Sequence, residues 1–238
     1  MQNRNFKTLV RLYWLVTLAL FALAIGVLAT YTPTEASMGP IQKIFYLHLP
    51  VAISTFLACM VCFIASIGYL TQRTSRWDDL ASAAARVAVQ LCAVVLISGM
   101  IWGRSAWGQW WTWSPRLTFS LVLFLLYVVY LMVRMSVESR ERRATIAAVY
   151  SIIAFLDVPL VWLSARLMPD IHPASVQLAG PMRLTLMAWF APVALLAAGL
   201  IATKFVANQR ERAAASTGDA AEVRPMRSEY FKTLGGAA

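Results

Sequence analysis

Two histidines and a cluster of tryptophans are the residues of this 238-residue sequence whose types and spacing could do chemistry. The histidines, His48 and His172, each lie one or two residues before a proline. Neutral imidazole is a good ligand for haem iron, and two imidazoles can occupy its opposite axial positions. The alternative is that each histidine only ends a helix in contact with water, and that interpretation stays open at this point.

The tryptophan cluster is the stronger signal, because five of the nine tryptophans fall within residues 102–113. A helix over 107–114 would bring three of them and Ser114 onto one face, since residues three, four and seven apart share a helix face. These three are Trp107, Trp110 and Trp111. Such a face is a flat apolar platform for a planar ligand with polar edges, an aromatic quinone or a partner protein. An aromatic belt at the membrane interface is the alternative, although a belt would spread its tryptophans over many helix ends.

The composition indicates that the solvent around most of the chain is lipid. Apolar residues make up 60% and charged residues only 13% of the sequence, whereas a soluble domain carries about a quarter charged residues. The net charge of +10 comes from basic residues that flank apolar runs, which indicates membrane orientation rather than nucleic-acid binding. The three cysteines all lie inside apolar runs, so no disulfide framework is expected. A soluble enzyme, a DNA-binding protein and a secreted disulfide domain are thereby disfavoured.

Six apolar runs are long enough to cross a bilayer as helices of about 20 residues. They cover residues 12–30, 49–70, 81–103, 117–135, 145–165 and 183–206. Strands cannot replace them, because unpaired backbone groups are too costly in lipid. The sequence therefore predicts an all-α, polytopic bundle of six transmembrane helices over 1–206, followed by a mobile cytoplasmic tail over 207–238.

The distribution of Lys and Arg predicts the orientation of the spans. One side of the membrane carries fifteen of them and the other side carries five, with Arg86 near the start of the third span. The positive-inside rule places both termini in the cytoplasm. The loops near 31–48, 104–116 and 166–182 are then extracytoplasmic, so both histidines and the tryptophan cluster fall on one face.

Several polar residues accompany this outer face. Ser114 followed by Pro115 is a strong start signal for the fourth span, with Ser as N-cap and Pro in the first turn. The basic residues predicted there are Lys43, Arg104, Arg116 and Arg183. They either anchor the chain at the interface or pair with the two carboxylates of a haem.

Three acidic residues lie within or near the spans. Asp157 falls inside the fifth span, two residues before Pro159, where it could ionise or bond to backbone groups freed by the proline. Asp78 and Asp79 are expected to cap or precede the third span.

The tryptophan segment resembles a family signature. The run Trp107-Gly108-Gln109-Trp110-Trp111-Thr112-Trp113-Ser114-Pro115-Arg116 is similar to the "WWD" signature of haem-handling proteins, and the six-span layout resembles haem exporter protein C of the cytochrome c maturation system. Phe45-Tyr46-Leu47-His48-Leu49-Pro50 and Asp157-Val158-Pro159 with His172-Pro173 resemble its two histidine regions. One departure is that Ser114 stands where the signature has Asp, which keeps an N-cap residue but removes a charge.

The resemblance implies a function that hydropathy and charge do not. It implies that the chain binds haem b on the outer face of a bacterial inner membrane, with His48 and His172 as axial ligands and Trp107, Trp110, Trp111 and Trp113 against the porphyrin. It also implies delivery to a membrane-tethered haem chaperone, beside an ABC transporter and a small membrane subunit, without catalysis by this chain. Two alternatives stay open: a b-type haem subunit that exchanges electrons with quinone, and a haem-free structural subunit of an ABC exporter.

Overall fold

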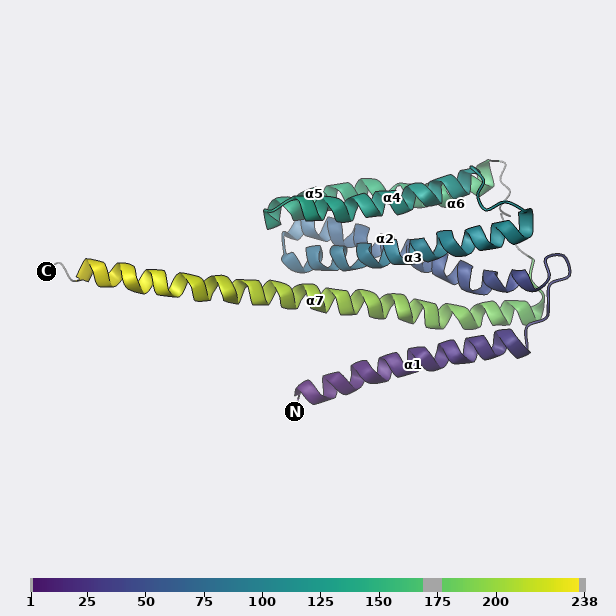
Figure 1. Ribbon diagram of the computed structural model, residues 1–238, viewed down its shortest axis with the longest axis horizontal. Helices are drawn as coiled ribbons and strands as arrows, with labels where there is room; N and C mark the ends of the chain where they lie inside the picture. The colour runs from purple at the N-terminus through teal and green to yellow at the C-terminus, as the bar shows by residue number, and fades with distance from the viewer. Residues whose placement is uncertain (1, 169–176, 236–238) are drawn as a thin grey trace.

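The computed structural model describes residues 2–168 and 177–235, which form a bundle of long helices (Figure 1). The elements are α1 (Gln2–Thr30), the 3-10 helix η1 (Pro40–Ile44), α2 (Phe45–Gln72), α3 (Ser75–Trp107), α4 (Pro115–Ser136), α5 (Arg140–Phe155), α6 (Asp157–Leu167) and α7 (Gly180–Gly235). Six segments of the described chain are long and apolar enough to cross a membrane, with α5 and most of α6 forming one of them. The prediction of an all-α protein with six membrane spans is confirmed.

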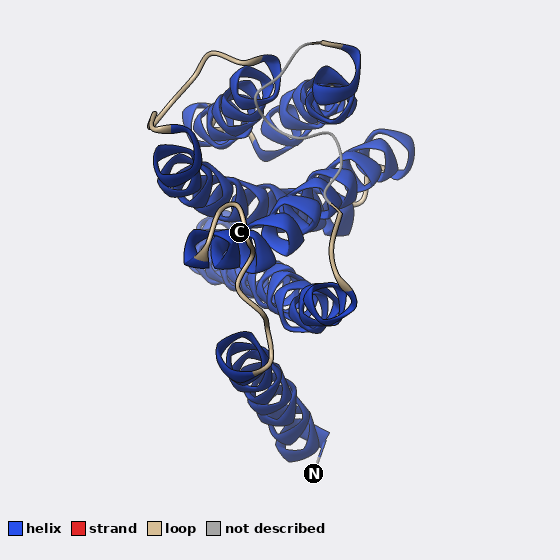
Figure 2. Ribbon diagram, turned by 90° about the vertical axis from the view of Figure 1, so that its right-hand side faces the viewer, coloured by secondary structure: helices blue, strands red, loops and turns tan. Residues whose placement is uncertain are grey.

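The spans lie side by side with alternating direction, so that both termini lie at the same end of the bundle (Figure 1). α2 and α3 form the centre and pack against each other along their lengths. α4, α5 and α6 cover one side of this pair, α7 covers the other, and α1 is the outermost helix, packed on α7 (Figure 2).

Small side chains explain why α2 and α3 approach so closely. Their buried contact residues include Ala58, Cys59, Cys62 and Ala65 from α2 and Ala81, Ala84, Ala85 and Ala88 from α3. In a membrane, where lipid tails are as apolar as leucine, close packing of small residues is a main source of helix association. The three cysteines are free and buried.

The helix boundaries near two prolines differ from the predicted ones. α2 begins at Phe45, so Pro50 lies inside the helix rather than in its first turn, and His48 lies in that first turn. The predicted fifth span is divided into α5 and α6 at Leu156. Pro159 has no N–H for the carbonyl of Phe155, and its ring clashes with that carbonyl, so α5 ends there.

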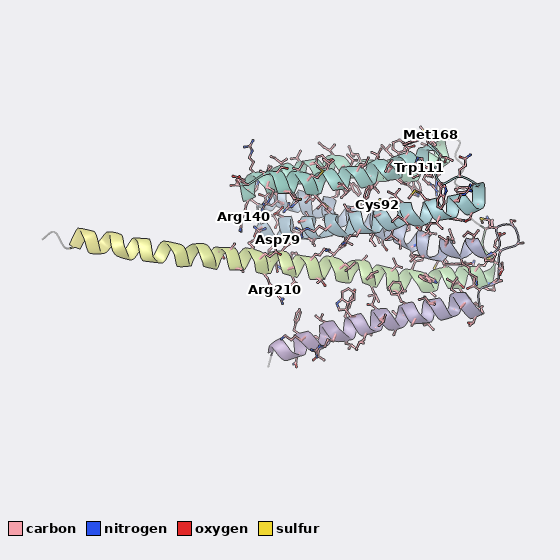
Figure 3. The ribbon with its side chains drawn as sticks, in the orientation of Figure 1. Asp79, Cys92, Trp111, Arg140, Met168 and Arg210 are labelled. Carbon is pink, nitrogen blue, oxygen red and sulfur yellow. The ribbon has the colours of Figure 1, made fainter. Side chains whose placement is uncertain are left out.

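Ion pairs join three helices at the end of the bundle that carries the termini. Asp78 accepts hydrogen bonds from both terminal nitrogens of Arg134 on α4, at 2.5 and 3.0 Å. Asp79 pairs with Arg212 on α7, and Figure 3 shows Asp79 at this end. The prediction that these aspartates cap or precede the third span is wrong, because both lie inside α3, which starts at Ser75 with Thr74 as its N-cap.

The C-terminal segment is a continuation of the last span. α7 does not end near residue 206 but runs on to Gly235, beyond the rest of the bundle (Figure 1). The division of the chain at 206 and the mobility of residues 207–238 stay predictions.

Candidate functional site

A cavity of about 370 Å³ opens at the end of the bundle away from the termini. It lies between the first turns of α2, the C-terminal half of α3, the start of α4, the middle of α6 and the start of α7. Its size falls within the range of about 300–1,000 Å³ that is typical of small-molecule sites. Its aromatic lining consists of Phe45, Phe56, Trp102, Trp107, Trp110, Trp111 and Trp162, beside the imidazole of His48. Such a lining fits a large planar apolar ligand.

His48 lines this cavity from α2 and is held by α3. Its Nδ1 lies 2.8 Å from Oγ of Ser98. The indole of Trp102 meets the imidazole edge to face, with ring centroids 5.9 Å apart. Gly99 leaves room for the ring, since a Cβ there would lie 3.3 Å from His48 Cε1. The imidazole is therefore fixed by three residues within little more than one turn of α3.

The tryptophan segment reaches the cavity by a route that the sequence did not predict. The helix considered over 107–114 does not form: α3 ends at Trp107, and Gly108 follows with φ of 75° and donates its N–H to the Arg104 carbonyl. A positive φ costs glycine no steric strain and ends a helix. The loop after Gly108 still brings Trp110 and Trp111 to the cavity beside Trp107.

Trp113 lies outside the cavity lining. Its side chain is 75% exposed and contacts Trp111 edge to face, with centroids 5.8 Å apart. Three of the four predicted platform residues therefore line the cavity. The fourth, Trp113, is exposed and packs against Trp111.

Polar groups in the loop also point to a ligand with polar edges. Trp111 Nε1 and Thr112 Oγ1 are buried and have no hydrogen-bond partner among the described residues. Both residues line the cavity. Buried donors are normally paired, because an unpaired one costs about 1–3 kcal/mol. A ligand that accepts hydrogen bonds at its rim fits these two groups.

The four predicted basic residues have different surroundings. Arg116, in the first turn of α4, lines the cavity. Arg104 donates to the Gly108 carbonyl at the end of α3, and Lys43 donates to the Leu28 carbonyl near the end of α1, at 3.2 Å. Arg183 lies exposed in the first turn of α7. Arg116 is thus the one of the four among the cavity-lining residues.

Ser114 begins α4 as predicted, with Pro115 as the first helical residue. Its side chain, however, makes no capping hydrogen bond, and its Oγ is buried without a partner in the described part of the chain. Only its backbone carbonyl takes part, accepting from Thr118 N at 2.9 Å.

The second predicted iron ligand, His172, lies outside the described residues, between α6 and α7. The elements on either side of this gap contribute to the cavity, since Trp162 in the middle of α6 and Leu178 just before α7 both line it. Whether His172 faces His48 stays a prediction.

Sequence reasoning missed Trp162 and gave Ser98 no role. Arg166 stacks on Trp162, with its guanidinium carbon 3.9 Å from the ring centroid. The i, i+4 spacing of an aromatic and a cation before the loop was the available signal. For Ser98 no local signal existed, because its partner lies fifty residues earlier.

Asp157 is the first residue of α6 and is buried, with 5% of its surface exposed. Its Oδ2 has no hydrogen-bond partner within the described residues. This oxygen makes no bond to backbone groups of the described residues, and the role of the Asp157 carboxylate stays a prediction.

Comparison of the sequence with known proteins identifies the family to which this arrangement belongs. The model of the family described as "Heme exporter protein C" matches residues 2–222. A "Heme exporter protein C" from Bradyrhizobium diazoefficiens is 33% identical over 169 residues, covering 70% of this chain and 64% of that protein. The proteins of the same name from Rhodobacter capsulatus and Escherichia coli K12 are 31% and 28% identical, over 59% and 69% of this chain and 59% and 68% of theirs. The matched part thus spans less than two thirds of the length of the first two relatives.

Proposed function

The chain belongs to the haem exporter protein C family, and from this premise we propose that it binds haem in the cavity beside His48 and hands it on for cytochrome c maturation. The observation that carries the proposal is the cavity itself, in which an imidazole and several indole rings line one space. Burial between indole rings favours the apolar porphyrin, and a neutral imidazole ligates its iron. Haem is here the cargo, not a resident cofactor.

Each predicted site residue has a role in this proposal. His48 and His172 ligate the iron from opposite sides, and Trp107, Trp110 and Trp111 pack on the porphyrin. Arg116 pairs with a propionate, because a guanidinium matches a carboxylate in a bidentate manner. Lys43, Arg104 and Arg183 add positive potential near the same end of the bundle. Haem b is the form of haem that we infer, as its vinyl groups are free for later attachment.

The orientation follows from the charge distribution. We place both termini and the ion pairs of Asp78 and Asp79 in the cytoplasm, in line with the positive-inside rule. The cavity then opens at the outer face of a bacterial inner membrane, where haem is needed for cytochromes c.

The proposed partners follow from membership of the haem exporter protein C family. We propose transfer to a membrane-tethered haem chaperone, which removes haem by supplying a competing ligand, with ABC transporter subunits and a small membrane subunit beside this chain. The exposed indole of Trp113 lies next to the cavity and is suited to contact the chaperone. No covalent chemistry is assigned to this chain.

The test is haem binding by purified variants in lipid nanodiscs. We expect His48→Ala and His172→Ala each to lose the low-spin spectrum of a bis-histidine haem. Unchanged haem content and an unchanged spectrum in both variants would refute the ligand assignment. Rapid haem reduction by a quinol would instead favour an electron-transfer subunit, and haem-free protein from haem-replete cells would favour a structural subunit.

A second pair of variants separates the cavity from the surface beside it. Trp110→Ala combined with Trp111→Ala should weaken haem retention, because both indoles line the cavity. Trp113→Ala is the matched control, as this indole lies outside the lining. It should retain haem and reduce only transfer to the chaperone. Normal retention in the double variant would leave the tryptophans with a membrane-belt role.

A further inference from the structure

Ser98 connects the imidazole of His48 to the backbone of α3. Its Oγ lies 2.8 Å from His48 Nδ1, 2.7 Å from the carbonyl oxygen of Val94 and 3.2 Å from that of Val95. The hydroxyl carries one proton and two lone pairs. The neighbour that accepts this proton determines whether Nδ1 of His48 must donate a hydrogen or accept one.

The carbonyl of Val94 can only accept, so the 2.7 Å contact is favourable only if Ser98 donates its proton there. Without that proton, two oxygen lone pairs would face each other at hydrogen-bond distance. The Ser98 oxygen is then an acceptor toward His48, and Nδ1 must carry a hydrogen to donate to it. In a neutral imidazole with its proton on Nδ1, the lone pair is on Nε2.

The rest of the contact fixes the ring around this hydrogen bond. Gly99 lies against Cε1 of His48, and a Cβ at this position would be 3.3 Å away. Trp102 contacts the ring edge to face. The ring therefore has little freedom to flip about its Cβ–Cγ bond, a rotation that would exchange Nδ1 with Cδ2 and Nε2 with Cε1.

We propose that Ser98 is a positioning residue that holds His48 as the Nδ1–H tautomer and so makes Nε2 the nitrogen that ligates a porphyrin-bound metal in the cavity. The tautomer is a property of this chain alone, whereas its use for haem rests on the proposed function. A neutral hydroxyl raises the basicity of a ligating imidazole less than a carboxylate would. Such a ligand suits a carrier, which must both bind and release its cargo.

The first experiment measures the tautomer without any ligand. The sequence has two histidines, so His48 is the sole imidazole of the His172→Ala variant. In [15N]histidine-labelled protein of this variant, in nanodiscs, the 15N shifts should show a protonated Nδ1 and an unprotonated Nε2. An Nε2–H tautomer, or an imidazolium at neutral pH, would overturn the proposal.

Substitutions at Ser98 test the cause. Adding Ser98→Ala removes the acceptor, so the spectrum should shift toward the Nε2–H form, whereas Ser98→Thr retains the hydroxyl and should retain Nδ1–H. Ser105→Ala is the matched control, because Ser105 bonds back to the Ile101 carbonyl on the same helix at 3.2 Å. Equal spectra for the alanine and threonine variants at position 98 would refute the role of Ser98.

Haem titration then tests whether the tautomer is used. With His172 present, Ser98→Ala should weaken haem binding about 10-fold to 100-fold, the usual effect of losing a hydrogen bond to a metal-ligating histidine. Ser98→Thr and Ser105→Ala should bind as the unaltered protein does. If the tautomer responds as expected but no variant, nor the parent, binds haem, the proposed function fails and the tautomer assignment stands. If haem binds through His48 and Ser98→Ala leaves the affinity unchanged, the use of the tautomer is refuted.

Discussion

The pair of Asp78 and Arg134 gives the sharpest prediction for the stability of the bundle. The two side chains are 6% and 13% exposed, and their two contacts measure 2.5 and 3.0 Å. Asp78→Asn preserves the volume but leaves the Arg134 guanidinium buried without its counter-charge. Removing one partner of a buried ion pair costs about 3–5 kcal/mol.

The lower half of that range applies here, because Arg134 retains a cation–π contact with the ring of Tyr130 at 5.8 Å. We therefore expect Asp78→Asn to lose about 3 kcal/mol of stability. For a chain of this length 1 kcal/mol shifts Tm by about 2–4 °C, so the expected fall in Tm is about 6–12 °C. Thermal unfolding can be followed with a thiol-reactive dye, since the three cysteines are free and buried.

Two further variants make this prediction selective. Asp157→Asn also removes a buried carboxylate, but one whose Oδ2 has no partner in the described part of the chain, so its Tm should change far less. Asp78→Leu combined with Arg134→Met replaces the pair by apolar groups. This double variant should recover most of the stability, and hence of the Tm, that Asp78→Asn loses. A Tm for Asp78→Asn equal to that of Asp157→Asn would refute the argument that this pair holds α3 to α4.

Three further predictions concern other parts of the chain. Gly199→Ala should loosen α1, because its Cβ would lie 2.6 Å from a ring carbon of Tyr13; overpacking of this kind costs about 1–3 kcal/mol, and faster proteolysis of α1 would report it. Backbone N–H groups, first that of Met38, donate to the Glu35 carboxylate and lower its pKa. These hydrogen bonds should therefore hold the loop above the ordinary glutamate pKa of about 4.3 and be lost as the pH falls through the lowered pKa of Glu35. Hydrogen exchange of the Met38 amide should show this loss, and Glu35→Gln should abolish its pH dependence. Ser114→Asp restores the charge of the signature at the start of α4, where the helix dipole favours an anion by about 0.3–1 kcal/mol; it should raise co-purification with the haem chaperone, and unchanged co-purification would show that the charge is dispensable.

The sequence was most informative where one local rule dominates. Six apolar runs became six spans, because in lipid a chain must satisfy its backbone hydrogen bonds within each helix. The start of α4 was equally local, since proline after Ser114 suits the first turn of a helix. For the tryptophan loop the spacing indicated correctly that Trp107, Trp110 and Trp111 lie together, since all three line one cavity. It did not indicate the backbone, because Gly108 ends the helix that the spacing suggested.

Contacts between spans could not be predicted, because a helix that is apolar on all sides does not reveal which face meets which neighbour. Asp78 looked like a cap until α4 brought Arg134 beside it, and α5 ended at a proline whose effect depends on the local backbone. By itself the sequence determined that this chain crosses a membrane six times and carries histidines and indoles in its loops, since hydropathy and residue type are properties of the chain alone. Only the tertiary structure decided that Ser98 on α3 contacts His48 on α2 and that His48 lines one cavity with the indoles, because such contacts depend on how each helix is rotated and packed.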